Sequence, residues 1–274
     1  IHTNLQAQPP AAPEDVNHHV EFAIASGVNH VWRLKELGIS VRGARIMEIG
    51  PGLAFGCAAY LRACGAVVAV SDRWLASWNN VFHGPVYTGI ADRLAHEEGF
   101  DVSPLRRMVE AGDYVEGTIR CINEPSENLA SIQDGEFDAI VSNAVLEHIE
   151  TPAKAFAELF RVTRNGGAGL HQVDFRDHRD NSRPLGHLLL QPEVFLRKTM
   201  RLNSDLGPQL RQPDYASLLG EAGFQIVRYE SNQSADEAYV DKVIARLART
   251  RMAQQGWTKD TLFDLGGLFF LTKP

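Results

Sequence analysis

Cysteine is scarce in this sequence, and its spacing excludes two classes of small domain. The 274 residues contain three cysteines, Cys57, Cys64 and Cys121. An odd number at unrelated spacings does not form a disulfide framework, and the sequence has no Cys-x-x-Cys pair that would indicate a zinc site. Three reduced thiols fit a cytoplasmic protein, which is the location that we expect.

Long apolar runs and an excess of positive charge are lacking too. No apolar run approaches the roughly 20 residues that span a bilayer, and the first residues show no charged-then-apolar secretory signal. The formal net charge is -7, whereas a protein that grips a phosphate backbone usually carries a basic surface. We therefore expect neither a membrane span nor a nucleic-acid partner.

What the sequence does contain is an alternation of apolar strands and helices. The expected strands are 44–49, 66–70, 118–122, 137–142, 168–173, 224–229 and 268–272. The expected helices are 15–37, 55–64, 152–163, 214–222 and 237–254, with shorter helical pieces at 92–98 and 104–111. Asn165-Gly166-Gly167 is the expected stop of the helix at 152–163. A strand without polar positions is buried on both faces, which favours a parallel sheet covered by helices.

The spacing of these elements predicts one α/β domain over residues 41–274. Residues 1–40 precede it as a polar arm and a helical lid. Two stretches, about 73–116 and 174–210, are longer than an ordinary connection between a strand and a helix, and we expect them to be insertions.

A ligand site is expected where the strands end, because open parallel sheets bind ligands beyond their carboxyl edge. Gly50 and Gly52 follow the first strand, and glycines there let the backbone approach a ligand. Asp72 ends the second strand, where an acid can accept hydrogen bonds from a ribose. Glu48 lies just before the glycines. It would repel a pyrophosphate but suits a ligand with a cationic amino group, such as S-adenosylmethionine (SAM).

Three motifs resemble those of the class I SAM-dependent methyltransferases. Residues 46–52 (Ile-Met-Glu-Ile-Gly-Pro-Gly) are similar to the first motif of that family. Residues 137–149 (Phe-Asp-Ala-Ile-Val-Ser-Asn-Ala-Val-Leu-Glu-His-Ile) are similar to its fourth-strand motif, and residues 161–167 to the turn before its fifth strand. The resemblance covers roughly residues 40–175. It implies a Rossmann-like, seven-stranded methyltransferase sheet.

The resemblance also implies a SAM site. The amino-acid end of SAM would lie against the glycine turn, the ribose at the end of the second strand, the adenine beside the loop before the fourth strand, and the methyl group at the end of the fourth. The implied residues are, in that order, Glu48, Gly50, Pro51 and Gly52; Asp72 and Arg73; Glu127 and the Asn128 backbone; and Asn143. The family often has a third glycine where this chain has Ala54, and Glu124 is an alternative to Glu127.

Two clusters could serve the methyl acceptor. The first is Glu147-His148, expected on the helix after the fourth strand. Some relatives bind a divalent metal there through a Glu-x-x-Glu-His pattern, of which this chain has only half because Ala144 replaces the first acid. The pair is therefore either a metal site, for Mg²⁺ or another divalent ion with His148 also a candidate for catalysis, or a structural pair.

The second cluster follows the fifth strand, in residues 171–178 (His-Gln-Val-Asp-Phe-Arg-Asp-His). His171, Asp174 and His178 are candidate bases, because a hydroxyl acceptor must lose its proton as it is methylated. The alternative is a polar start to a loop. A similar stretch occurs in methyltransferases that resemble enzymes of glycan assembly.

The sequence thus predicts a SAM-dependent methyltransferase that acts on a hydroxyl of a sugar, a glycan or another small molecule. N- or C-methylation of a natural-product, quinone or lipid acceptor is the alternative within enzymes. A SAM-binding subunit without catalysis is the alternative outside them. The expected partner is a small-molecule or glycan acceptor, and a homodimer stays open.

Overall fold

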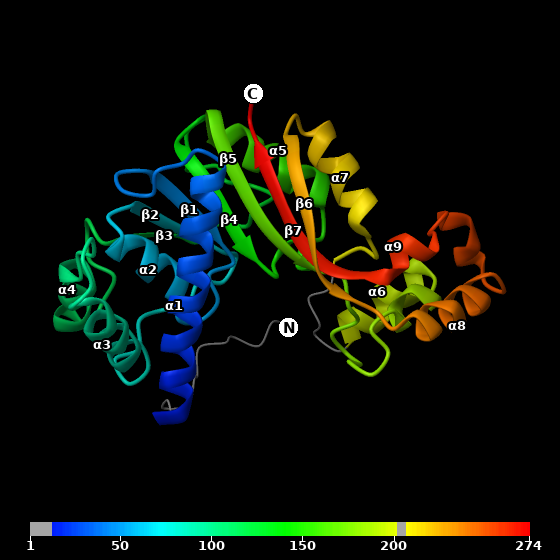
Figure 1. Cartoon of the computed structure of the whole chain (residues 1–274), viewed down its shortest axis with the longest axis horizontal. Coiled ribbons are helices and arrows are strands. Elements are labelled where there is room, and N and C mark those ends of the chain that lie inside the picture. Colours follow the sequence, from blue (N-terminus) through cyan, green and yellow to red (C-terminus); the bar gives the residue numbers. More distant parts are fainter. Residues whose placement is uncertain (1–12, 202–206) are drawn as a thin grey trace.

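The seven expected strands form a single mixed sheet in a computed structural model that describes residues 13–201 and 207–274. The strands are β1 (Arg45–Ile49), β2 (Val67–Ser71), β3 (Ile119–Ile122), β4 (Phe137–Asn143), β5 (Thr163–Asp174), β6 (Gln225–Ser234) and β7 (Asp264–Thr272). Their order is β3-β2-β1-β4-β5-β7-β6, and β7 runs antiparallel to both of its neighbours (Figure 1). The Rossmann-like methyltransferase sheet is therefore confirmed.

Helices cover both faces of this sheet. The helices of the described residues are α1 (Pro13–Glu36), α2 (Gly56–Ala63), α3 (His83–Leu94), α4 (Ser103–Ala111), α5 (Pro152–Val162), α6 (Pro192–Arg201), α7 (Gln212–Glu221), α8 (Glu237–Leu247) and α9 (Lys259–Phe263). Helices α1 to α4 share one apolar core with the sheet, and α5 and α7 share another on the opposite face. Both faces are thus buried, as the apolar strands predict.

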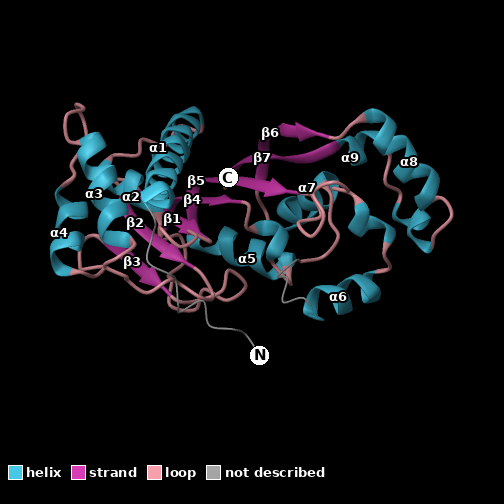
Figure 2. Cartoon of the chain, turned by 90° about the horizontal axis from the view of Figure 1, so that it is seen from below, coloured by secondary structure: helices cyan, strands magenta, loops and turns pink. Residues whose placement is uncertain are grey.

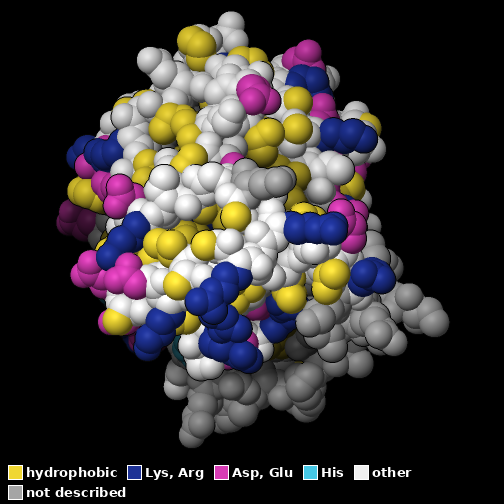
Figure 3. All heavy atoms as spheres, turned by 90° about the vertical axis from the view of Figure 1, so that its right-hand side faces the viewer, with side chains coloured by type: hydrophobic (Ala, Val, Ile, Leu, Met, Phe, Trp, Pro, Cys, Tyr) yellow, Lys and Arg dark blue, Asp and Glu magenta, His cyan; other side chains and the backbone are white. Residues whose placement is uncertain are grey.

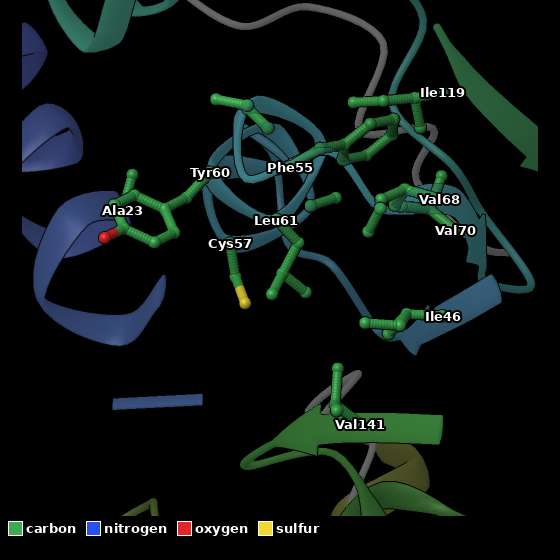
Figure 4. Packing of buried hydrophobic residues seen from close by; sticks show 14 of the residues in the cluster. Ala23, Ile46, Phe55, Cys57, Tyr60, Leu61, Val68, Val70, Ile119 and Val141 are labelled. Carbon is green, nitrogen blue, oxygen red and sulfur yellow. The ribbon is translucent and has the colours of Figure 1, made fainter. Parts of the chain in front are cut away.

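Close contact between α1 and α2 makes α1 part of the first core. A Cβ atom added to Gly27 of α1 would lie 2.2 Å from Cγ of Tyr60, and one added to Gly56 would lie 2.7 Å from Cβ of Ala23. Figure 4 shows Ala23 beside Tyr60, with side chains of the strands pointing to the same region. Most of α1 therefore covers the sheet. Figure 1 shows its N-terminal end extending past the carboxyl ends of the strands, so only that end could act as the expected lid.

A third, smaller core lies at the end of the molecule beyond β6 and β7 (Figure 2). We call it the satellite core; its buried members are Leu185, Leu188, Ala235, Val240, Val243, Leu247, Met252, Leu262 and Leu265. They come from the segment after β5, from the segment between β6 and β7, and from the start of β7. The two segments are far apart in sequence and fold against each other, so both flank the carboxyl end of β5.

Several predicted boundaries are wrong, and two of them concern α3 and α5. The helix expected at 92–98 is α3, which spans His83–Leu94. Gly84 and Gly89 weaken the helical signal of this segment, but its fully buried residues, Val86 and Ile90 among them, hold the helix against the first core.

The second wrong boundary lies after α5. This helix ends at Val162 rather than at Asn165-Gly166-Gly167, because β5 begins directly at Thr163. Gly166 is inside the strand, with φ of +69° and its N–H bonded to the carbonyl oxygen of Lys273 at 2.8 Å. The glycines thus shape the start of β5 instead of stopping the helix.

Lys and Arg residues gather at the α8 end of the molecule although the chain is acidic. Residues 242–259 contain five Lys or Arg and no Asp or Glu. Figure 3 faces this end and shows Lys and Arg side chains gathered over its lower middle part.

Among the described residues, no helix is long and apolar enough to cross a membrane.

Candidate active site

The turn after β1 is open on the side where a cofactor would lie. Gly50 and Gly52 have φ of +62° and +67°, which favours glycine at both positions. A Cβ atom added to Gly52 would have no neighbour within 4 Å, whereas one added to Gly50 would lie 2.3 Å from Val145. The backbone at Gly52 can therefore be approached by a ligand, while Gly50 packs against the loop after β4. Pro51 lies buried between them.

Glu48 is buried beneath this turn. Its side chain faces α2, where the backbone N–H of Ala58 donates to it. Its Oε2 atom has no hydrogen-bond partner among the residues that the structure describes. Burial raises the pKa of Glu48 to about 7. A buried carboxylate with an unsatisfied oxygen is suited to a cationic group, because pairing offsets the cost of its desolvation.

The end of β2 is linked to the loop before β4 by an ion pair. Asp72 follows β2, and its Oδ1 atom accepts a hydrogen bond from the Trp74 N–H at 2.8 Å. The guanidinium of Arg73 lies 3.3 Å from the Glu127 carboxylate. The structure thus brings Asp72, Arg73 and Glu127 to the same edge of the sheet, since β2 is next to β1.

Asn128 departs from its expected role. The resemblance implies that its backbone faces the adenine, but its N–H already donates to the carbonyl oxygen of Pro125 at 2.9 Å. This N–H closes a turn and is not available to a ligand. Asn143 ends β4 as expected, and the next residue, Ala144, has φ of +54°, so the chain turns sharply there.

These positions fit SAM. The orphaned oxygen of Glu48 can meet its ammonium group, the open backbone at Gly52 leaves room for its amino-acid end, and Asp72 can accept hydrogen bonds from its ribose. All three lie at the carboxyl ends of neighbouring parallel strands.

At the carboxyl end of β5, Asp174 and His178 form a hydrogen-bonded pair. The Nε2 atom of His178 lies 3.3 Å from Oδ2 of Asp174. The guanidinium of Arg176 donates to both oxygens of the same carboxylate, at 2.6 to 3.1 Å. Asp174 is buried, while His178 keeps about a third of its side chain exposed. The carboxylate therefore fixes the imidazole while leaving it within reach of a ligand.

The pKa values of the pair follow from this geometry. Burial favours the neutral form of Asp174, but hydrogen bonds from His178 and Arg176 outweigh it and hold the pKa of Asp174 well below its usual range. The hydrogen bond to Asp174 raises the pKa of His178 above 6.5, against the opposing effect of burial. Asp174 is thus a carboxylate at neutral pH, and it supports positive charge on His178.

Glu147 and His148 do not lie on the helix after β4, as predicted, but on the 3₁₀ turn Leu146–His148 that precedes α5. The turn brings His148 beside His178, with ring centroids 5.2 Å apart. The Nε2 atom of His148 is 4.0 Å from Oε1 of Glu147. The two clusters predicted from the sequence are therefore one cluster in space.

This cluster lacks the ligand set of a metal centre. Within residues 13–201 and 207–274, no three His, Cys, Asp or Glu side chains gather in a way that could hold an ion. Ala144 stands where the resemblance would need another acid. The predicted metal site at Glu147 and His148 has no support from the geometry.

His171 lies apart from the cluster of Glu147, His148, Asp174 and His178. It is fully buried on the α5 and α7 face of the sheet, and its Nδ1 atom is 2.8 Å from Oγ of Ser142 on β4. Burial lowers the pKa of His171 to about 3. A neutral imidazole closed off from solvent cannot take a proton from a substrate, so we no longer assign His171 a role in catalysis.

A small cavity next to Asp174 was not expected from the sequence. Its volume is about 20 Å³, and its lining includes Glu147, Arg176, His187 and Tyr215. Arg176 lies in a stretch that the sequence singled out, but nothing in the sequence links His187 or Tyr215 to it. His187 reaches the cavity from the turn Gly186–Leu189 after β5, and Tyr215 reaches it from α7.

The comparisons with known proteins agree with the fold. A family model described as "Methyltransferase domain" matches residues 83–170, from the start of α3 into β5. The match includes the β4 motif and the Glu147-His148 turn but not the glycine turn. No curated protein matches the chain in sequence.

Among solved structures, phosphoethanolamine N-methyltransferase 2 of Haemonchus contortus in complex with SAM has a TM-score of 0.52 at 13% identity, over 96% of this chain and 57% of that one. The same enzyme with phosphomonomethylethanolamine and S-adenosylhomocysteine gives 0.51 at 15%, over 95% and 57%. A SAM-dependent methyltransferase of Mesorhizobium loti gives 0.49 at 16%, over 87% and 94%. This chain thus spans 57% of the Haemonchus enzyme. At such low sequence identity, the structural similarity to the Haemonchus enzyme shows a shared fold alone.

Proposed function

We propose that this chain is a class I SAM-dependent methyltransferase and that it methylates a hydroxyl group of a sugar or another polyhydroxy small molecule. The observation that carries the proposal is the Asp174–His178 pair at the carboxyl end of β5. An alcohol is a poor nucleophile until its proton is removed, whereas a neutral amine needs no base. A histidine fixed by a buried carboxylate supplies such a base.

The donor half of the proposal rests on Glu48, Gly52 and Asp72. SAM supplies a methyl group on a sulfonium, which is already a strong electrophile. The protein has to hold this donor in line with the acceptor oxygen, and positioning is a large part of the rate enhancement in a two-substrate reaction. Glu48 would bind the ammonium group and Asp72 the ribose, which fixes both ends of the donor across the edge of the sheet.

The contact between His178 and Asp174 determines which nitrogen of His178 acts as the base. Its Nε2 atom faces the Asp174 carboxylate, so the N–H lies there and Nδ1 carries the lone pair. Nδ1 takes the proton of the acceptor hydroxyl while the new O–CH₃ bond forms and the S–CH₃ bond breaks. The products are a methyl ether, S-adenosylhomocysteine and a protonated His178 that Asp174 stabilises.

The first experiment measures transfer of a labelled methyl group from SAM to sugars, glycosides, phenols and amines, with and without EDTA. We expect label on a sugar hydroxyl, a loss of at least about a hundredfold in kcat for His178→Asn, and no effect of EDTA. Because only neutral His178 accepts a proton, kcat/KM should rise with pH through a pKa above 6.5.

The matched control is His96→Asn, a change of an exposed histidine on the turn after α3. Binding of SAM, measured by calorimetry, should be the same in both variants. Label on an amine, with full activity in His178→Asn, would replace this proposal with N-methylation, the activity named for the Haemonchus enzyme. Activity that EDTA abolishes would restore a metal to the site. Tight SAM binding without any turnover would indicate a non-catalytic subunit.

A further inference from the structure

The cavity next to Asp174 is lined by two buried side chains, Glu147 and His187, whose polar atoms lack hydrogen bonds in the part of the chain that the structure describes. Both carboxyl oxygens of Glu147 and the Nδ1 atom of His187 make no hydrogen bond within residues 13–201 and 207–274. Both side chains are more than nine-tenths buried, at 7% and 6% exposure. Unsatisfied polar atoms are costly in an interior, so two of them lining one cavity point to a ligand that satisfies both.

The size of the cavity limits what can enter. A volume of about 20 Å³ exceeds the roughly 10–15 Å³ that one water needs, so one small polar group fits and a whole sugar ring does not. Phe175, Phe195 and Tyr215 form apolar walls, and the Tyr215 hydroxyl already donates to the carbonyl oxygen of Leu146. The group that enters must therefore bond to Glu147 and His187.

The protonation states of these two side chains favour a hydroxyl as the bound group. Burial raises the pKa of Glu147 to about 8, and the nearby Asp174 carboxylate adds to the effect. Burial also lowers the pKa of His187 to about 3. At neutral pH the cavity then offers an O–H donor from Glu147 and a neutral ring nitrogen from His187. A hydroxyl can accept from the first and donate to the second, whereas an ammonium or a carboxylate can do only one of these.

We propose that Glu147 and His187 bind a second hydroxyl of the methyl acceptor, so that the enzyme selects polyhydroxy compounds over those with a single hydroxyl. Asp174 lines the cavity and also holds His178, so the second hydroxyl enters beside the base that activates the first. Both residues are specificity determinants, because they bind a group that does not react. This inference rests on the proposed function.

The test compares methyl glycosides with their monodeoxy analogues. The parent protein should use the best methyl hexopyranoside about 10 to 100 times more efficiently, in kcat/KM, than the deoxy analogue that lacks the bound hydroxyl. Glu147→Met removes the polar group at similar length, and the ratio should fall towards one. His187→Met should lower it as well.

Glu147→Gln is the matched control, because an amide keeps one donor and one acceptor and should retain most of the preference. Melting curves and SAM binding of each variant show whether it is folded. Two results would contradict the inference: an unchanged ratio of kcat/KM values in a folded Glu147→Met, or a ratio of one in the parent protein. Either would mean that the cavity holds only a buried water, while the proposal of hydroxyl methylation would stand. If the parent methylates no hydroxyl at all, the proposed function fails and this inference with it.

Discussion

Glu48 links the donor site to the stability of the protein. Its carboxyl has a pKa of about 7 in the folded chain, against roughly 4.5 in an unfolded one. A folded-state pKa above the unfolded value means that stability is fully present below about pH 4.5 and is lost as the pH rises through 7. The loss at high pH is on the order of 3 kcal/mol. The fold thus tolerates a costly charge at the place where a cationic ligand would relieve it.

We therefore expect Glu48→Gln to stabilise the ligand-free protein at pH 8 and to weaken SAM binding by about tenfold or more. Scanning calorimetry at pH 5 and pH 8, with titration calorimetry for SAM, measures both effects. The gain in Tm should be present at pH 8 and nearly absent at pH 5, where Glu48 is protonated in the parent too. Glu97→Gln, at an exposed position, is the control. An equal gain at both pH values would show that the charge of Glu48 is not the cause.

Parts of both sites could be predicted because some of their residues are neighbours in sequence. Glu48 and Gly52 belong to one strand and turn, and Asp174 and His178 are four residues apart. His187 could not be predicted, since its link to Glu147 depends on how a distant segment packs. Likewise, the burial of His171 depends on which strands flank β5, and no local pattern reveals that order.

At the scale of elements, Arg211 connects the segments around the acceptor site. Its side chain is fully buried at the start of α7. The guanidinium donates to the carbonyl oxygens of Phe175 at 2.9 Å and Thr261 at 3.1 Å, and also to that of Asp264. One side chain thus joins the residue after Asp174 to α9 and to the start of β7. Burial lowers the pKa of Arg211 to about 10, which leaves it charged at neutral pH.

Arg211→Met would leave these three carbonyl oxygens buried without a donor. We expect a loss of about 3 kcal/mol or more in the free energy of unfolding, because each orphaned acceptor carries a desolvation cost. Urea denaturation measures this loss. Arg246→Met on exposed α8 is the matched control and should stay within about 0.5 kcal/mol of the parent. Equal denaturation midpoints for the two variants would contradict the assigned role.

The elements themselves differ in how far the sequence determines them. β1 and β2 are short apolar stretches buried on both faces, so their composition alone predicts their burial. α3 carries two glycines and becomes helical only through packing. The segment between β6 and β7 was predicted as one helix at 237–254, but α8 ends at Leu247 and α9 follows. Its partner is the segment after β5, and tertiary contacts of this kind leave no periodic signal.

At the scale of the whole molecule, the satellite core is a separate unit of packing. Its buried apolar residues form a cluster distinct from the two cores on the sheet. It is built on only nine buried apolar residues, far fewer than the cores that flank the sheet. Local opening requires less free energy where fewer apolar contacts are broken. The acceptor side should therefore open more readily than the donor side.

Val240→Ala and Val141→Ala test this difference with the same change at two fully buried positions, one in the satellite core and one in the core of α1 to α4. Each removes two methyl groups and should cost about 2 kcal/mol. For Val240→Ala we expect faster amide exchange over residues 186–189 and 237–263 with β1 and β4 unchanged, and a lower kcat with unchanged SAM binding. For Val141→Ala we expect faster exchange across the whole sheet and a lower Tm.

The satellite core is a separate unit only if the two exchange patterns differ, because a single cooperative unit would spread both changes over the same amides. If they differ, closure of the acceptor site can vary while the donor site stays fixed.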